Sequence, residues 1–165
     1  MIEIRDEQQA DIAAIREVNR SAFGQDQEAN IVDALRTNGA AVLSLVAELE
    51  GRVVGHIMYS PLAVADFSGA ALGPMAVVPQ YQRQGIGSSL IRAGNRRLLE
   101  SGCPFVAVVG HAGYYPRFGF TRAIDYGMTC EWDVPAEVFM VLLLDSSKKG
   151  LLSGTAKYRP EFSTA

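Results

Sequence analysis

Seven consecutive residues in the middle of the chain have the types and spacing of an anion-binding loop. They run Gln82-Arg83-Gln84-Gly85-Ile86-Gly87-Ser88, between a β-rich segment and a helical pattern. The first amides of a helix have no carbonyl partner, and the helix dipole adds partial positive charge there. Gly85 and Gly87 carry no Cβ, so a phosphate can approach the backbone closely. Arg83 adds a positive charge and Ser88 a hydroxyl donor. The segment is predicted to bind a phosphorylated ligand.

Two common phosphate-binding motifs do not fit this loop. A Walker loop requires a lysine after its last glycine, and none follows here. A dinucleotide fingerprint requires a third glycine where Leu90 stands, and a strand near the start of the chain.

Hydrophobic periodicity predicts the elements in the first half of the chain. Apolar spacing indicates a strand at Ile2–Ile4, a helix with Ile12, Ile15 and Val18 on one face, and a second helix capped by Asp26 and ended by Gly39. Two β-rich runs, Leu43–Leu49 and Arg52–Tyr59, meet at Glu50-Gly51, which is typical of a hairpin.

The second half begins with a turn at residues 66–69 and a third antiparallel strand over Ala70–Val78. At Gly73-Pro74 this strand should bulge or lose its pairing with a neighbouring strand, because proline has no backbone N–H to donate. The helix after the loop buries Ile86, Leu90, Ile91 and Leu98 and exposes Arg92, Asn95, Arg96 and Glu100. Apolar strands follow at Phe105–Val109 and Val138–Leu144, the latter central, with weaker strand signals over residues 120–132. A strand-helix-strand series implies a parallel pair. The fold class is α/β (α+β): a mixed, mostly antiparallel sheet with helices on its faces.

Two motifs together resemble the GNAT N-acetyltransferases. Residues 82–87 are similar to the family's Q/R-x-x-G-x-G/A pyrophosphate loop, and Met75-Ala76-Val77-Val78-Pro79 resembles its central bulged strand. Downstream, Tyr115-Pro116-Arg117-Phe118-Gly119-Phe120 resembles the family's Tyr-x-x-x-Gly-Phe element. The order of elements agrees over residues 2–144.

The resemblance implies acetyl-coenzyme A as co-substrate, no metal, and a parallel pair splayed at the coenzyme site. Backbone groups of Met75, Ala76 and Val77 would hold the pantetheine arm and the thioester carbonyl. The pyrophosphate would be held by Gln82, Arg83, Gln84, Gly85, Ile86, Gly87 and Ser88, with Tyr115 and Phe118 also at the coenzyme.

Direct transfer of an acetyl group to an amine requires a neutral amine and a protonated leaving thiolate. The resemblance makes Tyr115 the proton donor, since the family's tyrosine faces the coenzyme sulfur. Tyr114 lies one residue too far from Gly119. Glu28 and His111 are alternative bases, and Phe23 is a further candidate for the acceptor pocket. His56 is expected to be structural. Trp132 is expected to pack in the core by default, with lining a pocket as the alternative.

Composition limits the other functions. The 165 residues, 48% hydrophobic and 20% charged, fit one soluble domain with a C-terminal tail from about residue 151. The net charge of −3 disfavours nucleic acid, and the longest apolar run, seven residues, is too short for a membrane span. Cys103 and Cys130 are expected to be buried thiols, and the cytoplasm is the expected location.

The sequence therefore predicts an acetyl-CoA-dependent N-acetyltransferase acting on a primary amine of a small molecule or peptide. A non-catalytic acyl-CoA sensor is the alternative. Dimerisation through the sheet edge or the C-terminal strands stays open, as does docking of the tail around Tyr158 on the chain itself or on a partner.

Overall fold

The computed structural model describes residues 1–164, which form two compact units. Unit 1 contains Met1–Ser60, Gly73–Gly94 and the C-terminal residues from Pro160, and unit 2 contains Pro61–Leu72 and Asn95–Arg159. Two long strands and one helix each contribute residues to both units: β3 (Arg52–Val64), β4 (Phe67–Val77) and α3 (Ile86–Glu100).

Unit 1 is built on an antiparallel sheet in which strands β1, β2, β3 and β4 follow one another. Its further elements are β1 (Ile2–Asp6), η1 (Gln9–Asp11), α1 (Ile12–Phe23), α2 (Gln27–Thr37), β2 (Leu43–Leu49), η2 (Pro79–Tyr81) and α4 (Glu161–Thr164). The hairpin of β2 and β3 turns at Glu50-Gly51, as the sequence predicts, with both residues at positive φ.

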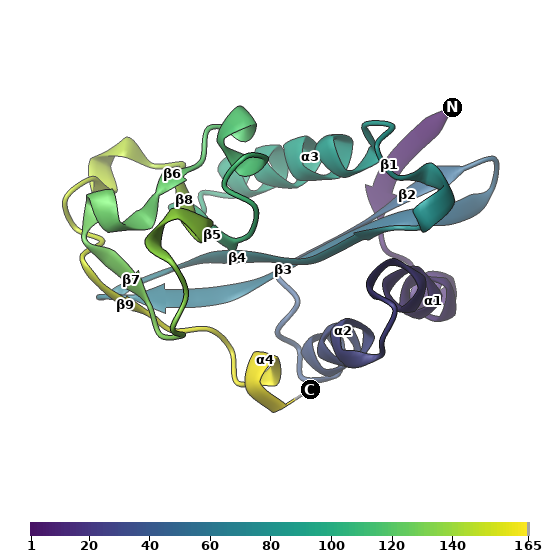
Figure 1. The fold of residues 1–165 in the computed structure, drawn as a ribbon, viewed down its shortest axis with the longest axis horizontal. Helices are drawn as coiled ribbons and strands as arrows, with labels where there is room; N and C mark the ends of the chain where they lie inside the picture. Colours follow the sequence, from purple (N-terminus) through teal and green to yellow (C-terminus); the bar gives the residue numbers. More distant parts are fainter. Residues whose placement is uncertain (165) are drawn as a thin grey trace. The chain divides into compact units, whose positions relative to one another are not determined.

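Helices lie on both faces of this sheet (Figure 1). The side chains of successive strand residues point to opposite faces, so each face can pack against a helix. Val46 and Met58 pack with the apolar faces of α1 and α2. On the other face, a Cβ at Gly55 would meet Ile86 and Leu90 of α3 at 3.1 and 3.2 Å. Gly55 thus permits α3 to lie close to the strand.

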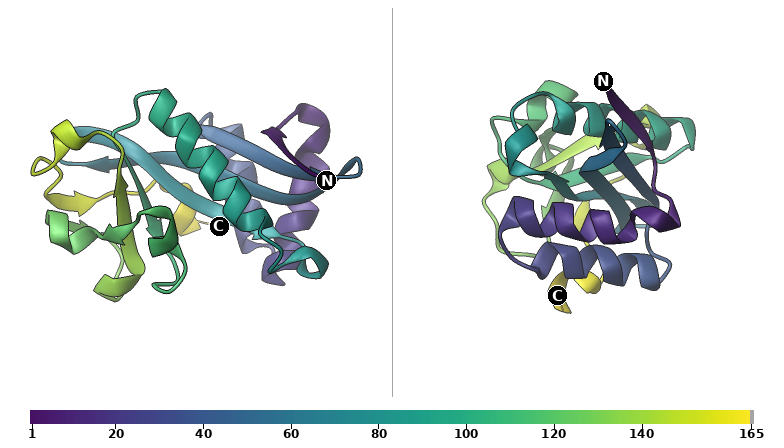
Figure 2. Two further views of the ribbon diagram at one scale, coloured as in Figure 1. Left: turned by 90° about the horizontal axis from the view of Figure 1, so that it is seen from above. Right: turned by 90° about the vertical axis from the view of Figure 1, so that its right-hand side faces the viewer.

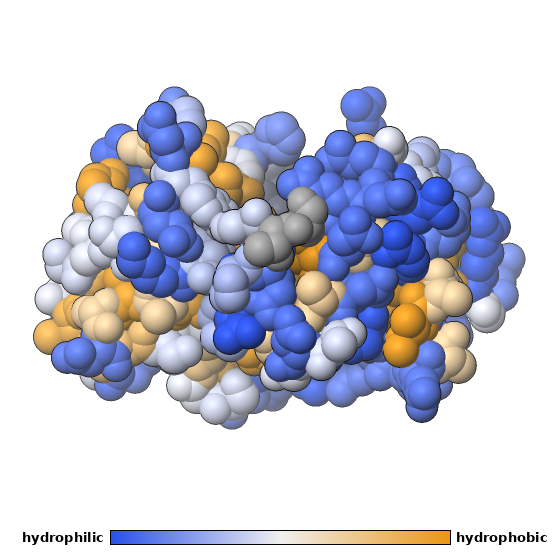
Figure 3. Space-filling model, turned by 90° about the horizontal axis from the view of Figure 1, so that it is seen from below, coloured by the Kyte–Doolittle hydropathy of each residue, from blue (hydrophilic) through white to orange (hydrophobic). Residues whose placement is uncertain are grey.

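The two N-terminal helices lie side by side and bury one apolar stripe each (Figure 2). Their solvent faces are mostly hydrophilic, as the surface view shows over this part of unit 1 (Figure 3). Asp26 stands at the N-cap of α2 as predicted, but its side chain does not cap the helix. Its carboxylate instead accepts a hydrogen bond from Nε of Arg20, at 2.7 Å.

In unit 2 the strands follow the order β3, β4, β5, β8 and β6. Its elements are β5 (Phe105–Val109), η3 (Tyr115–Phe118), β6 (Thr121–Arg122), η4 (Ala123–Tyr126), β7 (Met128–Cys130), η5 (Ala136–Val138), β8 (Phe139–Leu143), η6 (Ser146–Lys148) and β9 (Gly154–Ala156). The pair β4 and β5 is parallel, as predicted, and its ladder joins Ala70 to Val106 and Ala71 to Ala107. The apolar strand β8 has neighbours on both sides, which confirms its central place.

Two strand boundaries and one position that was predicted to be exposed differ from the prediction. β3 continues past Pro61 to Val64, where the backbone of Ala63 pairs with that of Lys157. β4 begins at Phe67, so the turn lies earlier, around Ala65, which has a φ of 51°. Asn95, expected on the solvent face of α3, is buried. The weak segment 120–132 forms only the short strands β6 and β7.

Residues after 151 contain β9, which pairs in parallel with β7, and the short helix α4. Phe162 packs against the apolar cluster of unit 1, and Glu161 accepts a hydrogen bond from Asn38 at 2.8 Å. This segment therefore docks on its own chain. Both cysteines are free thiols and half-buried rather than buried.

Candidate coenzyme and catalytic sites

The backbone before α3 is turned so that the helix begins with an open first turn. Arg83 has a φ of 64° and Gly85 a φ of 86°, both in the left-handed region. Only glycine adopts this conformation without steric cost, which explains Gly85 but makes Arg83 a strained position. The space beside Gly85 is open, because a Cβ there would have no atom within 4 Å.

Hydrogen bonds from two glutamines hold the loop to the chain before it. Nε2 of Gln82 donates to the carbonyl of Val77 at 2.9 Å, and Nε2 of Gln84 donates to the carbonyl of Gln80 at 3.3 Å. The first turn of α3 closes with the Ser89 amide on the Gly85 carbonyl at 3.0 Å. The loop is thus tied at the end of β4, which explains why Gln82 belongs to the motif.

This first turn has the features of a diphosphate site. Amides at the start of α3 lack a carbonyl four residues earlier in the helix, and the dipole adds positive charge. Arg83, Gln84 and Gly85 are exposed, Gly87 and Ser88 are partly exposed, and Ile86 is buried as an anchor. The open space at Gly85 leaves room for a bulky anion, so the residues fit the diphosphate of coenzyme A.

The strand segment proposed for the pantetheine arm lies in the second half of β4. Ala76 and Val77 are buried and Met75 is half-buried. Gly73 has a φ of 137° and precedes a cis Gly73-Pro74 bond. The Val78 amide donates to the Val54 carbonyl at 2.9 Å, which holds the end of the strand against β3.

Tyr115 begins the 3-10 helix η3 in unit 2 and is buried to 8% exposure. Its amide donates to the His111 carbonyl at 3.3 Å, and Gly119 ends the turn with a φ of 94°. The ring lies edge-on to Tyr114 and Phe120, at centroid distances of 5.1 and 5.7 Å. A Cβ at Gly110 would clash with this ring, so the glycine makes room for it.

The surroundings of Tyr115 further stabilise the protonated form of its hydroxyl. Burial, with a smaller effect from Tyr114, raises the pKa of Tyr115 to about 12. The neutral hydroxyl is then present throughout the physiological pH range, which a proton donor requires. Tyr114, by contrast, is half-buried and lies under the guanidinium of Arg117, at 4.7 Å from its ring centre.

The candidates for the acceptor side lie in both units. In unit 1, Phe23 is the last residue of α1 and is 41% exposed, and Glu28 lies in the first turn of α2. Both carboxylate oxygens of Glu28 accept from Nε2 of Gln25, at 3.1 and 3.2 Å. In unit 2, His111 is exposed in the loop after β5. Phe118, a candidate for coenzyme binding and not for the acceptor, lies in η3 and is half-buried, with 5.2 Å between its ring centre and that of Tyr114.

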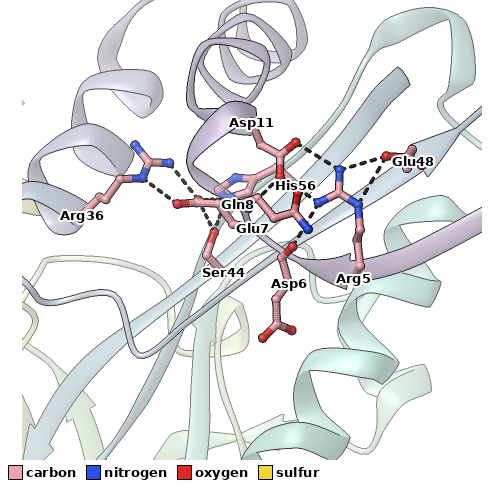
Figure 4. A network of polar contacts seen from close by, with 9 residues as sticks. All are labelled: Arg5, Asp6, Glu7, Gln8, Asp11, Arg36, Ser44, Glu48 and His56. Carbon is pink, nitrogen blue, oxygen red and sulfur yellow. Dashed lines mark hydrogen bonds and ion pairs between the residues drawn. The ribbon is translucent and has the colours of Figure 1, made fainter. Parts of the chain in front are cut away.

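Sequence analysis did not predict a polar network inside unit 1 that surrounds His56 (Figure 4). His56 is fully buried, with Nδ1 at 3.4 Å from Nδ2 of Asn19 and Nε2 at 2.9 Å from Oγ of Ser44. Ser44 donates to Glu7 at 2.6 Å, so its oxygen accepts from Nε2 of His56. Arg36 binds both oxygens of Glu7, at 2.7 and 2.8 Å. His56 is structural, as expected.

The pKa values in this network follow its geometry. Burial lowers the pKa of His56 to about 3, so the ring is neutral. Burial alone would raise the pKa of Glu7, but hydrogen bonds from Arg36 and Ser44 lower it below its usual value. Beside it, Arg5 binds both oxygens of Asp11, at 2.8 and 3.0 Å, and also Glu48 at 2.8 Å.

The part of the chain that the structure describes contains no group of three or more His, Cys, Asp or Glu residues placed to hold a metal ion. Within residues 1–164, no helix has the length and apolar character needed to cross a membrane.

Comparison with known proteins identifies the family. Residues 10–120 match the model of the Acetyltransferase (GNAT) family, which is more than half of the chain. The chain belongs to this family, and it is an N-acetyltransferase. The fold class inferred from the sequence is thereby confirmed, as is the resemblance that the two motifs carry.

Three relatives illustrate the likeness. The uncharacterized N-acetyltransferase YjhQ of Escherichia coli (strain K12) is 42% identical over 138 residues, covering 78% of this chain and 75% of the relative. The crystal structure of the GNAT family N-acetyltransferase YhbS from Escherichia coli, in complex with CoA, has a TM-score of 0.93 and 32% identity, covering 98% of this chain and 92% of that one. A GNAT family acetyltransferase from Brucella melitensis, in complex with acetyl-CoA, has a TM-score of 0.84 and 35% identity over 98% of both chains.

Proposed function

We propose that this protein transfers the acetyl group of acetyl-CoA directly to a primary amine of a small molecule or peptide. The observation that carries the proposal is the open first turn of α3, preceded by Arg83 and Gly85 in left-handed conformations. Two relatives that match 98% of the chain were crystallised with CoA or acetyl-CoA, which supports the same co-substrate here.

Different residues of the chain have different roles in such a transfer. Amides of the first turn of α3, with Arg83 and Ser88, hold the diphosphate. Backbone groups of Met75 to Val77 orient the pantetheine arm and the thioester carbonyl. Acetyl-CoA supplies the acetyl group in activated form. The Tyr115 hydroxyl donates its proton to the departing thiolate, with Phe118 beside the coenzyme.

The acceptor amine has to lose a proton before it attacks. Glu28 and His111 are the two groups proposed to receive it, directly or through water, and Phe23 is proposed to contact the acceptor. The proposed transfer is direct and passes through no covalent enzyme intermediate, and neither cysteine belongs to this machinery. The cytoplasmic location stays a prediction.

An assay over a panel of amines tests this function. The panel contains an alkylamine, a polyamine, an aminoglycoside, an amino acid and a peptide with a free N-terminus. We expect amine-dependent release of CoA with one N-acetylated product per CoA, identified by mass spectrometry. Tight binding of acetyl-CoA without transfer to any of these amines would instead support a non-catalytic sensor.

A further inference from the structure

Unit 2 contains a pocket of about 410 Å³, lined by residues between Ile124 and Phe139. Its walls come from η4, from β7 and from the loop that leads to β8. None of the residues proposed above for coenzyme binding or proton transfer lines it. Its volume lies in the usual range for small-molecule sites, so it suits a compact organic ligand.

Part of the lining is apolar. Met128 and Phe139 are buried residues that contribute to the pocket, whereas Ile124 is 43% exposed. An apolar ligand body in the pocket would remove the Ile124 side chain from water, which favours binding. The pocket is therefore suited to a ligand with a hydrocarbon or aromatic part.

The polar part of the lining has one sign of charge. Glu131 and Asp133 are the only Asp, Glu, Lys, Arg or His residues among the described residues that line the pocket, and both carry carboxyl groups. One oxygen of Glu131 accepts the amide hydrogen of Tyr158 at 2.6 Å, which fixes its position. Two carboxylates with no lysine or arginine among the lining residues favour a cationic ligand.

An aromatic pair completes the site. Trp132 lines the pocket, and its ring stacks on that of Tyr158, with 4.1 Å between ring centres and 26° between planes. The Tyr158 segment is held in turn by two backbone hydrogen bonds between Lys157 and Ala63, at 2.7 and 3.1 Å. Tyr158 thus covers one face of the indole ring, and Trp132 is an aromatic lining residue of the kind that attracts a cation.

From these three features we infer that the pocket binds an organic cation, a protonated amine or a guanidinium group carried on an apolar or aromatic body. A bare metal ion does not suit it, because the two carboxylates and the Cys130 thiol of the lining do not form a group placed to hold one. Of the two sequence-based alternatives for Trp132, packing in the core or lining a pocket, the structure shows the second.

A carboxylate partner stabilises the protonated form of an amine, and only a neutral amine attacks a thioester. The pocket therefore recognises a cation that does not react while bound there. Such a cation is either a second charged group of the acceptor or a separate ligand. Only the first of these, a second charged group of the acceptor, depends on the proposed function.

Tryptophan fluorescence tests the inference directly, because Trp132 is the only tryptophan of the chain. The probes are 2-phenylethylammonium, 2-phenylethanol and phenylacetate, which share one body and differ in charge. In the absence of acetyl-CoA, we expect saturable changes in emission with the cation binding most tightly and the anion most weakly. No change with any probe, or equal affinity for all three, would overturn the inference.

A charge-neutral variant with a matched control sharpens this test. Glu131→Gln with Asp133→Asn removes both charges and keeps an oxygen that accepts from Tyr158. We expect the cation to bind roughly 5- to 20-fold more weakly, with unchanged binding of the alcohol. Glu137→Gln removes an exposed carboxylate that does not line the pocket, and it should bind like the wild type. Equal losses in both variants would contradict a specific site.

Steady-state kinetics of the double variant distinguish between the two sources of the cation. If it belongs to the acceptor, the double variant raises KM for diamines but not for acetyl-CoA. If it is a separate ligand, KM for every amine stays unchanged while the fluorescence response is still lost. Failure of all amines as acceptors would sink the proposed function, but it would leave the fluorescence result standing.

Discussion

At the scale of single residues, the role proposed for Tyr115 is the simplest to isolate. Its hydroxyl is protonated at physiological pH, as that of an ordinary tyrosine is, and burial raises its pKa further, to about 12. Burial also makes it a weaker acid than free tyrosine, so its value as a donor depends on position more than on acid strength.

Replacing Tyr115 by phenylalanine should lower kcat by roughly 100-fold, because the leaving thiolate loses its proton donor. The dissociation constant of acetyl-CoA should hardly change, since the ring and its packing remain. Steady-state kinetics and calorimetry measure the two effects. Tyr114→Phe is the matched control in the same turn. An equal loss of kcat in both variants would remove the specific role of Tyr115.

His56 makes a separate prediction about pH. Its pKa is near 3 when folded and near 6.5 when unfolded, so the unfolded chain takes up the proton first. The stabilisation from this residue is complete above pH 6.5 and is lost as the pH falls toward 3. The loss amounts to at most about 1.4 kcal/mol per pH unit for this one proton.

Urea unfolding at several pH values measures this dependence, with Glu7 and Arg36 as the charged groups that face His56 in the network. A His56→Gln variant should be less stable at neutral pH and less sensitive to acid below pH 6.5. His111→Gln removes the exposed histidine and should keep the wild-type slope. The same slope in all three proteins would show that His56 takes up no proton on unfolding.

At the scale of elements, the coenzyme hypothesis depends on the first turn of α3. Gly85→Ala should raise the dissociation constant of acetyl-CoA roughly tenfold, because the added Cβ enters the open space assigned to the diphosphate. It should also cost about 1 kcal/mol of stability, since φ is 86°.

Gly102 provides a matched control at the other end of the same helix. It has a φ of 85° and equally open surroundings, so Gly102→Ala should cost the same stability. Coenzyme affinity should stay unchanged in this variant. If both alanine variants bind acetyl-CoA as the wild type does, the diphosphate is not held at Gly85.

Elements with strong periodicity were predictable, and those formed by distant pairing were not. The helix α3 was predicted from its buried apolar stripe, Ile86, Leu90, Ile91 and Leu98. The predicted bounds of β2 and β5 agree with the observed bounds to the residue. β3 continues beyond Pro61 because Ala63 finds a partner in Lys157, more than 90 residues later. No local pattern carries that information. The same applies to β7 and β9, which have three residues each and pair with one another. The residues of β7 line the pocket.

The same distinction, between local patterns and distant pairing, applies to the candidate sites. The loop before α3 and the turn at Tyr115 are continuous segments, so their motifs were visible in the sequence. Glu131, Trp132 and Asp133 become a pocket only after the chain folds back at Tyr158. A run of mixed polar and aromatic residues without periodicity gives no signal for such a cavity.

At the scale of the whole molecule, the last residues of the chain are part of unit 1 rather than an appendage. Ending the chain after Arg159 should lower the free energy of unfolding by about 2 kcal/mol, because Phe162 leaves the apolar cluster. The buried Glu161–Asn38 hydrogen bond is lost as well. Chain termination after Phe162 keeps both contacts and is the control. Equal stability of the two shortened chains would show that these contacts contribute nothing.

The two units carry different parts of the proposed function. Unit 1 holds the loop before α3, and unit 2 holds Tyr115 and the cation pocket. Coenzyme binding, proton donation and cation recognition are therefore testable one at a time with the variants described above.

Amide NMR during a titration with acetyl-CoA measures the central claim most directly. The account predicts saturable shifts at Gly85, Ile86, Gly87 and Ser88, with Gly102 unmoved at the far end of the helix. Saturation of the protein by acetyl-CoA with these four amides unshifted would contradict it.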